Sequence, residues 1–294
     1  VGVHQDDCFD FKLIEYYREL QTTHKNKKGG SEAFCDPHRT PGYSSSCTCT
    51  HPLLPVRHVP STPQFYVKWD KAHQRNVHLA SAVKENLDVL LLGDSITEHW
   101  MGTSLAVARQ KYAGIHKQYQ ELIEGRPGLA LGIAGDRCPQ LLWRLGHGEL
   151  PNNGGATPDS SLSPRVVWLL IGTNDLDEGC RRQVVMIGVV NLVLQLLNQT
   201  SSAVVVNGIL PRPADASGTM EGSVIWDDIQ WINKQLQCWA RHTQRVQYFD
   251  ASSIFLMQNG TMLNKELMPD NLHPNGKGSH MWGKAIVEYL ESME

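Results

Sequence analysis

Short apolar runs recur along the chain from about residue 88 onward, and each runs into a turn-forming residue such as glycine, aspartate or proline. They lie at 88–92, 129–133, 166–171, 203–209 and 246–250. Runs of this length, rich in Val, Ile and Leu and bounded by turn residues, are typical of strands buried on both faces. The pattern therefore predicts five core strands.

Longer segments with apolar residues at helical spacing fill the intervals between these runs. They predict helices at 71–86, 98–124, 138–146, 181–199, 224–242 and 280–292. Strands that alternate with helices favour a parallel sheet covered by helices on both faces. We therefore expect an α/β fold, a three-layer α/β/α sandwich around a five-stranded parallel sheet.

Residues 1–70 have a different texture, with many prolines, a Gly29-Gly30 pair and a Ser44-Ser45-Ser46 run. Only the segment from Phe9 to Leu20 has a helical pattern there. We therefore divide the chain into an irregular N-terminal extension, residues 1–70, and a catalytic domain, residues 71–294. The chain begins at Val1, as a processed or trimmed chain would.

Composition and charge exclude several classes of protein. Of the 294 residues, 41% are hydrophobic and 19% are charged, which is typical of a globular protein with a packed core. A net charge of −3 gives no basic surface for nucleic acid, so we expect no nucleic-acid partner. The apolar stretches are too short or too interrupted for a membrane span.

Seven cysteines are unevenly placed, at positions 8, 35, 47, 49, 138, 180 and 238. Four of them lie in the first fifty residues, and Asn198 and Asn259 begin Asn-x-Thr acceptor sites for glycosylation. These features favour disulfides and a secreted or secretory-pathway protein, with the cytoplasm as the alternative. The odd count implies at least one free thiol or an intermolecular bridge, and we expect the unpaired cysteine to be Cys238 in its helical segment.

A zinc site is the competing interpretation of the N-terminal cysteines. Its ligands would come from Cys35, His38, Cys47, Cys49 and His51. Zinc sites usually space paired cysteines by two to four residues, and Cys47-Thr48-Cys49 is tighter than that. We therefore expect no metal and no other cofactor.

Ser95 is the candidate nucleophile. It follows the first predicted strand within Gly93-Asp94-Ser95 and opens a helical segment, where backbone N–H groups can stabilise a negative oxygen. Taken alone, the same serine could simply cap that helix. His99 lies one helical turn further on and is expected to point away from the hydroxyl.

The segment Asp270-Asn271-Leu272-His273 contains an acid and a base three residues apart. A serine hydroxyl needs a base to take its proton, and that base must be held in one tautomer by a third group. Asp270 can hold Nδ1–H of His273 and leave Nε2 for Ser95. Pro274 biases His273 away from helical geometry, so the pair is expected in a loop before the last helix. A turn with an incidental histidine is the alternative.

Two further strand ends contain groups that can donate to an oxyanion. Gly135 follows the second strand and can present its backbone N–H, while Asn174 follows the third and offers a side-chain amide. Either residue alone could be an ordinary turn residue. Together with Ser95, they place a nucleophile and two donors at successive strand ends.

Four blocks of sequence resemble those of the SGNH, or GDSL-type, serine hydrolases. They are Gly93-Asp94-Ser95, the segment from Gly132 to Asp136, Gly172-Thr173-Asn174-Asp175, and the segment from Asp270 to His273. The resemblance covers about residues 71–294 and implies that family's fold. It implies a nucleophilic Ser95, a base at His273, an acid at Asp270, and oxyanion donors from the Ser95 and Gly135 amides and the Asn174 side chain.

The segments 141–145, 148–150 and 210–212 further resemble the catalytic subunits of intracellular platelet-activating-factor acetylhydrolase. This likeness implies a short acyl group and hydrolysis without a metal. Residues 1–70 have no counterpart there. Cys138 and Cys180, close to Gly135 and Asn174, are expected either to form a bridge between the two loops or to remain as buried thiols.

The leading hypothesis is therefore a serine carboxylic-ester hydrolase that removes a short, acetyl-like group from a lipid or glycan ester. The alternative is a non-catalytic binding or assembly subunit that has kept the fold. In either case, residues 1–70 are the candidate element for a protein partner.

Overall fold

Five parallel strands form the centre of the structure, a computed structural model that describes residues 34–38, 47–58, 63–84, 86–150 and 162–294. In order across the sheet they are β4 (Gly128–Gly132), β1 (Val89–Gly93), β5 (Val166–Leu170), β6 (Ala203–Asn207) and β7 (Val246–Phe249). Every pairing is parallel. The expected strands and the expected fold class are confirmed.

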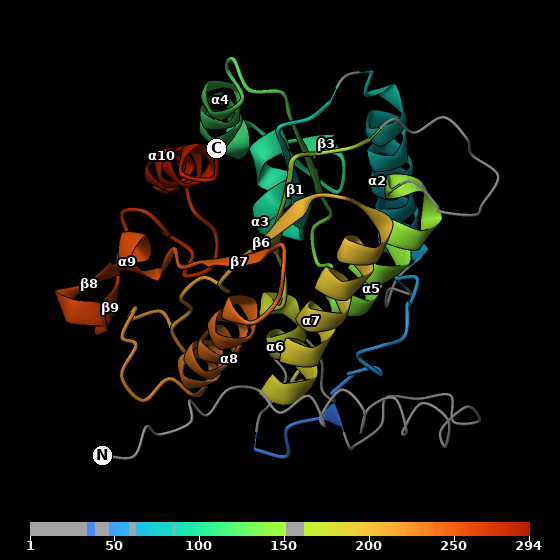
Figure 1. Cartoon of the computed structure of the whole chain (residues 1–294). Coiled ribbons are helices and arrows are strands. Elements are labelled where there is room, and N and C mark those ends of the chain that lie inside the picture. The colour runs from blue at the N-terminus through green and yellow to red at the C-terminus, as the bar shows by residue number, and fades with distance from the viewer. Residues whose placement is uncertain (1–33, 39–46, 59–62, 85, 151–161) are drawn as a thin grey trace, which may run out of the picture.

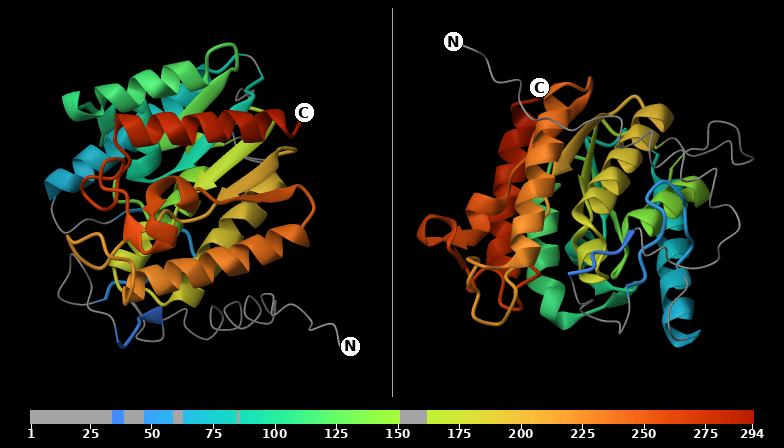
Figure 2. Two further views of the ribbon diagram at one scale, coloured as in Figure 1. Left: turned by 90° about the vertical axis from the view of Figure 1, so that its left-hand side faces the viewer. Right: turned by 90° about the horizontal axis from the view of Figure 1, so that it is seen from below.

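Helices cover both faces of this sheet, as Figures 1 and 2 show. On one face lie α4 (Ala113–Leu122) and α10 (Gly276–Glu291), which pack against each other. On the other lie α5 (Cys138–Arg144), α7 (Arg182–Gln199) and α8 (Val224–Arg241). All residues of β1 and β5 are buried, because their runs of Val, Leu and Trp are enclosed from both sides.

Helix α2 (Pro63–Ala82) is the helix predicted at 71–86, and it packs beside the π-helical turn η4 (Leu145–Glu149). The division of the chain into residues 1–70 and 71–294 stays a prediction, and α2 runs across its boundary. The helical pattern from Phe9 to Leu20 lies outside the described residues.

The single helix predicted at 98–124 is wrong. The chain instead forms α3 (Ser95–Glu98), η2 (His99–Met101), the hairpin of β2 (Thr103–Ser104) and β3 (Val107–Ala108), η3 (Gln110–Tyr112) and α4. Gly102, Leu105 and Ala106 all have positive φ angles, which a continuous right-handed helix excludes. The hairpin interrupts the helix because Glu98 binds its backbone N–H groups, as described below.

Smaller elements complete the carboxyl edge of the sheet. They are α6 (Thr173–Asp177), α9 (Ser252–Phe255), η5 (Gln258–Gly260) and the hairpin of β8 (Leu256–Met257) with β9 (Met262–Leu263). Within the part of the chain that the structure describes, none of the helices has the length and apolar character of a membrane span.

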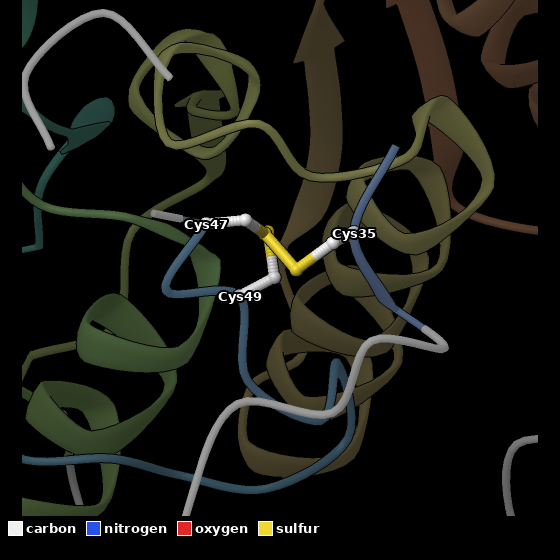
Figure 3. A group of neighbouring side chains, drawn as sticks. All are labelled: Cys35, Cys47 and Cys49. Atoms are coloured by element: carbon white, nitrogen blue, oxygen red, sulfur yellow. A yellow bond between two sulfur atoms is a disulfide. The ribbon is translucent and has the colours of Figure 1, made fainter. Parts of the chain in front are cut away.

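Among the described residues, two disulfides join cysteines near the N-terminus to each other and to the sheet domain. Cys35 bonds Cys47, and Cys49 bonds Cys180 just after α6. The sulfur atoms of Cys35, Cys47 and Cys49 lie within 4.8 Å of one another (Figure 3). Because these sulfurs are bonded in disulfides, they are not available as the thiolate ligands of the zinc site considered above.

The expectations for the remaining cysteines need correction. Cys238 is disulfide-bonded, so it is not the free thiol. Among the described residues, Cys138 is the free cysteine; it is buried and forms no disulfide with Cys180. Its side chain lies against Gly188 of α7, where a Cβ atom would be 2.8 Å from that of Cys138. Close packing of α5 on α7 therefore encloses Cys138. Cys180 instead faces the N-terminal segment, where its backbone forms an isolated antiparallel β-bridge with Cys35 and its sulfur is bonded to Cys49.

The two disulfides are expected to differ in their contribution to stability. Cys49 and Cys180 are 131 residues apart and Cys35 and Cys47 only 12, so the former closes the larger loop of the unfolded chain. Cys49→Ala/Cys180→Ala should lower the free energy of unfolding by about 2–4 kcal/mol, and by up to about 2 kcal/mol more than Cys35→Ala/Cys47→Ala. Urea titration of both double variants measures this, and equal losses would contradict the loop-entropy argument.

Candidate active site

The predicted catalytic residues gather at the carboxyl edge of the sheet, around β1 and its two neighbours. The chain leaves β1 for β4 on one side and then returns to β5 on the other. Such a reversal of strand order opens a crevice beyond the strand ends, where open α/β sheets bind ligands. The loops after β1, β4 and β5 and the segment before α10 supply the site.

Ser95 opens the four-residue helix α3 directly after β1. Asp94 caps this helix, and its Oδ1 accepts the N–H of Ile96 at 2.9 Å. The turn packs closely against β4. A Cβ atom at Gly132 would lie 2.3 Å from the backbone nitrogen of Glu98 and 2.5 Å from the backbone oxygen of Asp94. Only glycine allows this approach, which sets the position of Ser95 relative to the end of β4.

The structure brings Ser95, His273 and Asp270 into one chain of hydrogen bonds. Ser95 Oγ lies 3.0 Å from His273 Nε2, and His273 Nδ1 lies 2.8 Å from Asp270 Oδ2. Asp270 Oδ1 also accepts the backbone N–H of His273 at 2.7 Å. In the tautomer with a proton on Nδ1, the imidazole donates to Asp270 and accepts from Ser95.

Electrostatics keep Asp270 ionised although part of its environment disfavours charge. Partial burial raises the pKa of this carboxyl, but hydrogen bonds from the ring and the backbone of His273 outweigh it and hold the pKa below its ordinary value. Asp270 is therefore an anion at every pH at which the protein would be assayed. It can orient the imidazole and stabilise its protonated form.

The two candidate oxyanion donors lie next to this chain. Gly135 is exposed after β4 with φ of 86°, and its N–H has no hydrogen-bond partner among the described residues. Asn174, in the first turn of α6, donates its amide to the Asp136 carbonyl at 2.8 Å and reaches Asp94 Oδ2 at 3.4 Å. The Asn174 amide is thus tied to the residue after Gly135 and the residue before Ser95.

His99 does not point away from the site, contrary to expectation. Its ring centroid lies 4.8 Å from that of His273 and 3.6 Å from that of Tyr112. The direction differs because α3 ends at Glu98 and a 3₁₀ turn follows, so the regular helical spacing is lost. Burial lowers the pKa of His99 to about 3, so it adds no positive charge beside His273.

Arg144 forms a buried ionic network beneath the Ser95 turn, which the sequence did not indicate. The guanidinium donates to Asp136 Oδ2 (2.6 Å), Glu149 Oε1 (2.9 Å) and Oε2 (2.7 Å), the Gly93 carbonyl (3.1 Å) and the Leu131 carbonyl (2.8 Å). Trp69 Nε1 binds Asp136, and His73 Nδ1 lies 3.0 Å from Glu149. The feature of the sequence that could have pointed to this network is the arginine within the otherwise apolar segment 141–145.

Asp94 is a buried acid whose protonation should make stability depend on pH. Burial, followed by the nearby charges of Asp136 and Asp175, raises the pKa of Asp94 to about 7. Between about pH 4 and 7 the folded protein then holds a proton that the unfolded chain releases. The free energy of unfolding therefore falls as pH rises through this window, by at most about 1.4 kcal/mol per pH unit for one group.

Asp94→Asn, which cannot ionise, is expected to make this fall less steep between pH 5 and 7. Chemical denaturation at pH 5, 6, 7 and 8 measures the slope for both proteins. Asp227→Asn is the matched control, because Asp227 is an exposed acid in the first turn of α8. Identical slopes for wild type and Asp94→Asn would show that Asp94 does not bind this proton.

The chain is similar to known proteins over most of its length. The sequence profile of the GDSL-like lipase/acylhydrolase family matches residues 91–281. The chain is 28% identical over 225 residues to human platelet-activating factor acetylhydrolase IB subunit alpha2, covering 76% of this chain and 83% of that protein. It is 25% identical over 208 residues to the rat alpha1 subunit, covering 70% of this chain and 75% of that protein.

Solved structures share the fold. A GDSL-like lipase from Bacteroides thetaiotaomicron superposes with a TM-score of 0.56 and 19% identity, over 77% of this chain and 98% of that one. The family match includes Ser95, Gly135, Asn174, Asp270 and His273, which the structure brings to one edge of the sheet. This chain belongs to the GDSL-like lipase/acylhydrolase family, and it is a hydrolase that acts on esters.

Proposed function

We propose that this protein removes a short, acetyl-like acyl group from a lipid or glycan ester through a covalent intermediate on Ser95. The contact that carries the proposal is the 3.0 Å hydrogen bond between Ser95 Oγ and His273 Nε2, with Asp270 behind the imidazole. A serine becomes a nucleophile when a base within hydrogen-bond reach takes its proton. Ser95 is 8% exposed, so its hydroxyl is partly shielded from water.

In the first half of the reaction, Ser95 Oγ bonds to the ester carbonyl carbon while its proton passes to His273 Nε2. The carbonyl oxygen becomes an anion, stabilised by the N–H groups of Ser95 and Gly135 and by the Asn174 amide. The bond from carbon to the alcohol oxygen then breaks. The departing alkoxide takes the proton from His273, and the acyl group remains on Ser95.

In the second half, water gives a proton to His273 Nε2 and its oxygen attacks the acyl carbon. The bond to Ser95 Oγ breaks, the serine recovers its proton from His273, and the carboxylic acid leaves. Asp270 stays an anion throughout and stabilises the imidazolium in both halves. All protons and electron pairs are accounted for by the ester, water and these side chains.

The acyl group is inferred from the relatives, since two of them are named as acetylhydrolase subunits. The disulfides and the exposed side chains of Asn198 and Asn259 support a secreted or secretory-pathway protein that is glycosylated. We further propose that residues 1–70 contribute a protein-binding element.

Hydrolysis of p-nitrophenyl acetate, butyrate and octanoate tests the acyl specificity. We expect kcat/KM to be highest for acetate and to fall by about 10-fold or more for octanoate. A fluorophosphonate probe, located by mass spectrometry, should label Ser95. A preference for octanoate would overturn the short-acyl assignment. Absence of both turnover and labelling in a folded sample would favour the non-catalytic assembly subunit instead.

A further inference from the structure

Glu98 is a buried carboxylate close to Ser95 that the mechanism above does not use. It ends helix α3 and is only 1% exposed. Its Oε1 accepts the Thr103 hydroxyl at 3.0 Å and the Ala106 N–H at 2.8 Å. Its Oε2 accepts the Leu105 N–H at 2.9 Å and the Ala134 N–H at 2.8 Å. Four donors are what a buried carboxylate needs to offset its lost hydration.

The first two backbone donors belong to an unusual hairpin turn. β2 and β3 pair Thr103 with Ala108 and Ser104 with Val107, which leaves Leu105 and Ala106 as the two turn residues. Both have positive φ, of 52° and 59°, a pattern usually formed by asparagine and glycine. Side chains at positive φ are strained, and such strain persists only where the surroundings impose it. Glu98 imposes it by accepting both N–H groups.

The third backbone donor belongs to the segment with the candidate oxyanion amide. Ala134 directly precedes Gly135, so the bond to Glu98 sets the peptide orientation one residue before that amide. On its other side, the Asp136 carbonyl accepts from Asn174. Gly135 is therefore held between two anchored neighbours, while its own N–H is left without a partner among the described residues.

Glu98 and Ser95 lie three residues apart in the same short helix, so they move as one unit. One helical turn and one hydrogen bond then connect the Ser95 backbone to Ala134. We propose that Glu98 is a positioning residue, which sets the Gly135 amide in place for the oxyanion formed on Ser95. This inference rests on the proposed function. It predicts an effect on the chemical step that general stabilisation of the hairpin would not produce.

Glu98→Gln tests the proposal. The glutamine has an NH₂ group where one carboxylate oxygen was, so at that position donors of the network would face another donor instead of an acceptor. Displacement of one oxyanion donor should lower kcat for p-nitrophenyl acetate by about 10–100-fold. KM should change little, because the ground-state ester makes little use of the oxyanion site. Affinity for phenylboronic acid, whose tetrahedral adduct on serine places an oxygen there, should fall by the same factor as kcat/KM.

Thr103→Val is the matched control. It removes the hydroxyl that donates to the same carboxylate on the hairpin side and accepts from Arg75, and it leaves the Ala134 bond intact. We expect kcat and boronate affinity close to wild type, with any loss confined to thermal stability. Rates for all variants are normalised to the sites that a fluorophosphonate titrates. Equal loss of kcat in Thr103→Val and Glu98→Gln would overturn the positioning role.

Glu98→Asp keeps the charge but shortens its reach, and it serves if Glu98→Gln does not fold. The same fall in kcat and boronate affinity is expected, without a matching rise in KM. Wild-type kcat in a folded Glu98 variant would refute the inference while leaving the proposed function intact. Failure of the wild type to hydrolyse acetate or to be labelled at Ser95 would instead refute the proposed function.

Discussion

Replacement of Ser95 by alanine is expected to lower kcat for p-nitrophenyl acetate by about 10⁴-fold or more, without loss of the fold. The alanine variant lacks the oxygen that would form the acyl-enzyme, so the proposed two-step route is closed. Its methyl group fits the space left by the hydroxymethyl group of a residue that is mostly buried. Stopped-flow and long-time assays on purified variants give the rates, and circular dichroism monitors the fold.

The partners in the hydrogen-bonded chain predict a specific pattern of non-additivity. His273→Ala should approach the loss of Ser95→Ala, because a serine without a base is a weak nucleophile. The double variant should be no slower than Ser95→Ala alone, since both changes disable one unit. Residual turnover above about one per cent in Ser95→Ala would contradict the assignment of Ser95. A further loss in the double variant would show that His273 acts independently.

Arg144→Met is expected to cause the largest loss of stability, about 3–5 kcal/mol in the free energy of unfolding. The guanidinium is fully buried and pairs with Asp136 and Glu149, which are also fully buried. Burial disfavours its charge, but these two carboxylates outweigh burial and raise the pKa of Arg144. Methionine would deprive both buried carboxylates of their ion-pair partner and two backbone carbonyls of their donor.

Urea denaturation of three variants separates burial from charge. Arg144→Lys keeps the charge but has three N–H donors instead of five, so an intermediate loss is expected. Lys117→Met is the control, because Lys117 and Glu121 form an exposed pair at 3.8 Å that should contribute well under about 1 kcal/mol. If Arg144→Met lost no more stability than Lys117→Met, the buried network would not be a principal support of the Ser95 turn.

These variants also show where sequence patterns reach their limit. The apolar runs predicted β1, β4, β5, β6 and β7, because an enclosed strand requires apolar residues on both faces. The helix predicted at 98–124 failed at the β2–β3 hairpin. Leu105 and Ala106 have no local preference for positive φ, and the Glu98 carboxylate that imposes it lies seven and eight residues away from them in the chain.

By itself, the sequence determined the α/β architecture, the order of its elements and the polar residues expected at the strand ends, because these depend on short-range patterns. Only the tertiary structure decided which groups meet. It joined Cys180 to Cys49 rather than to Cys138, turned His99 toward His273, and enclosed Arg144 among acids. Each of these contacts depends on how distant segments pack, and burial then gives charges and thiols properties that composition cannot specify.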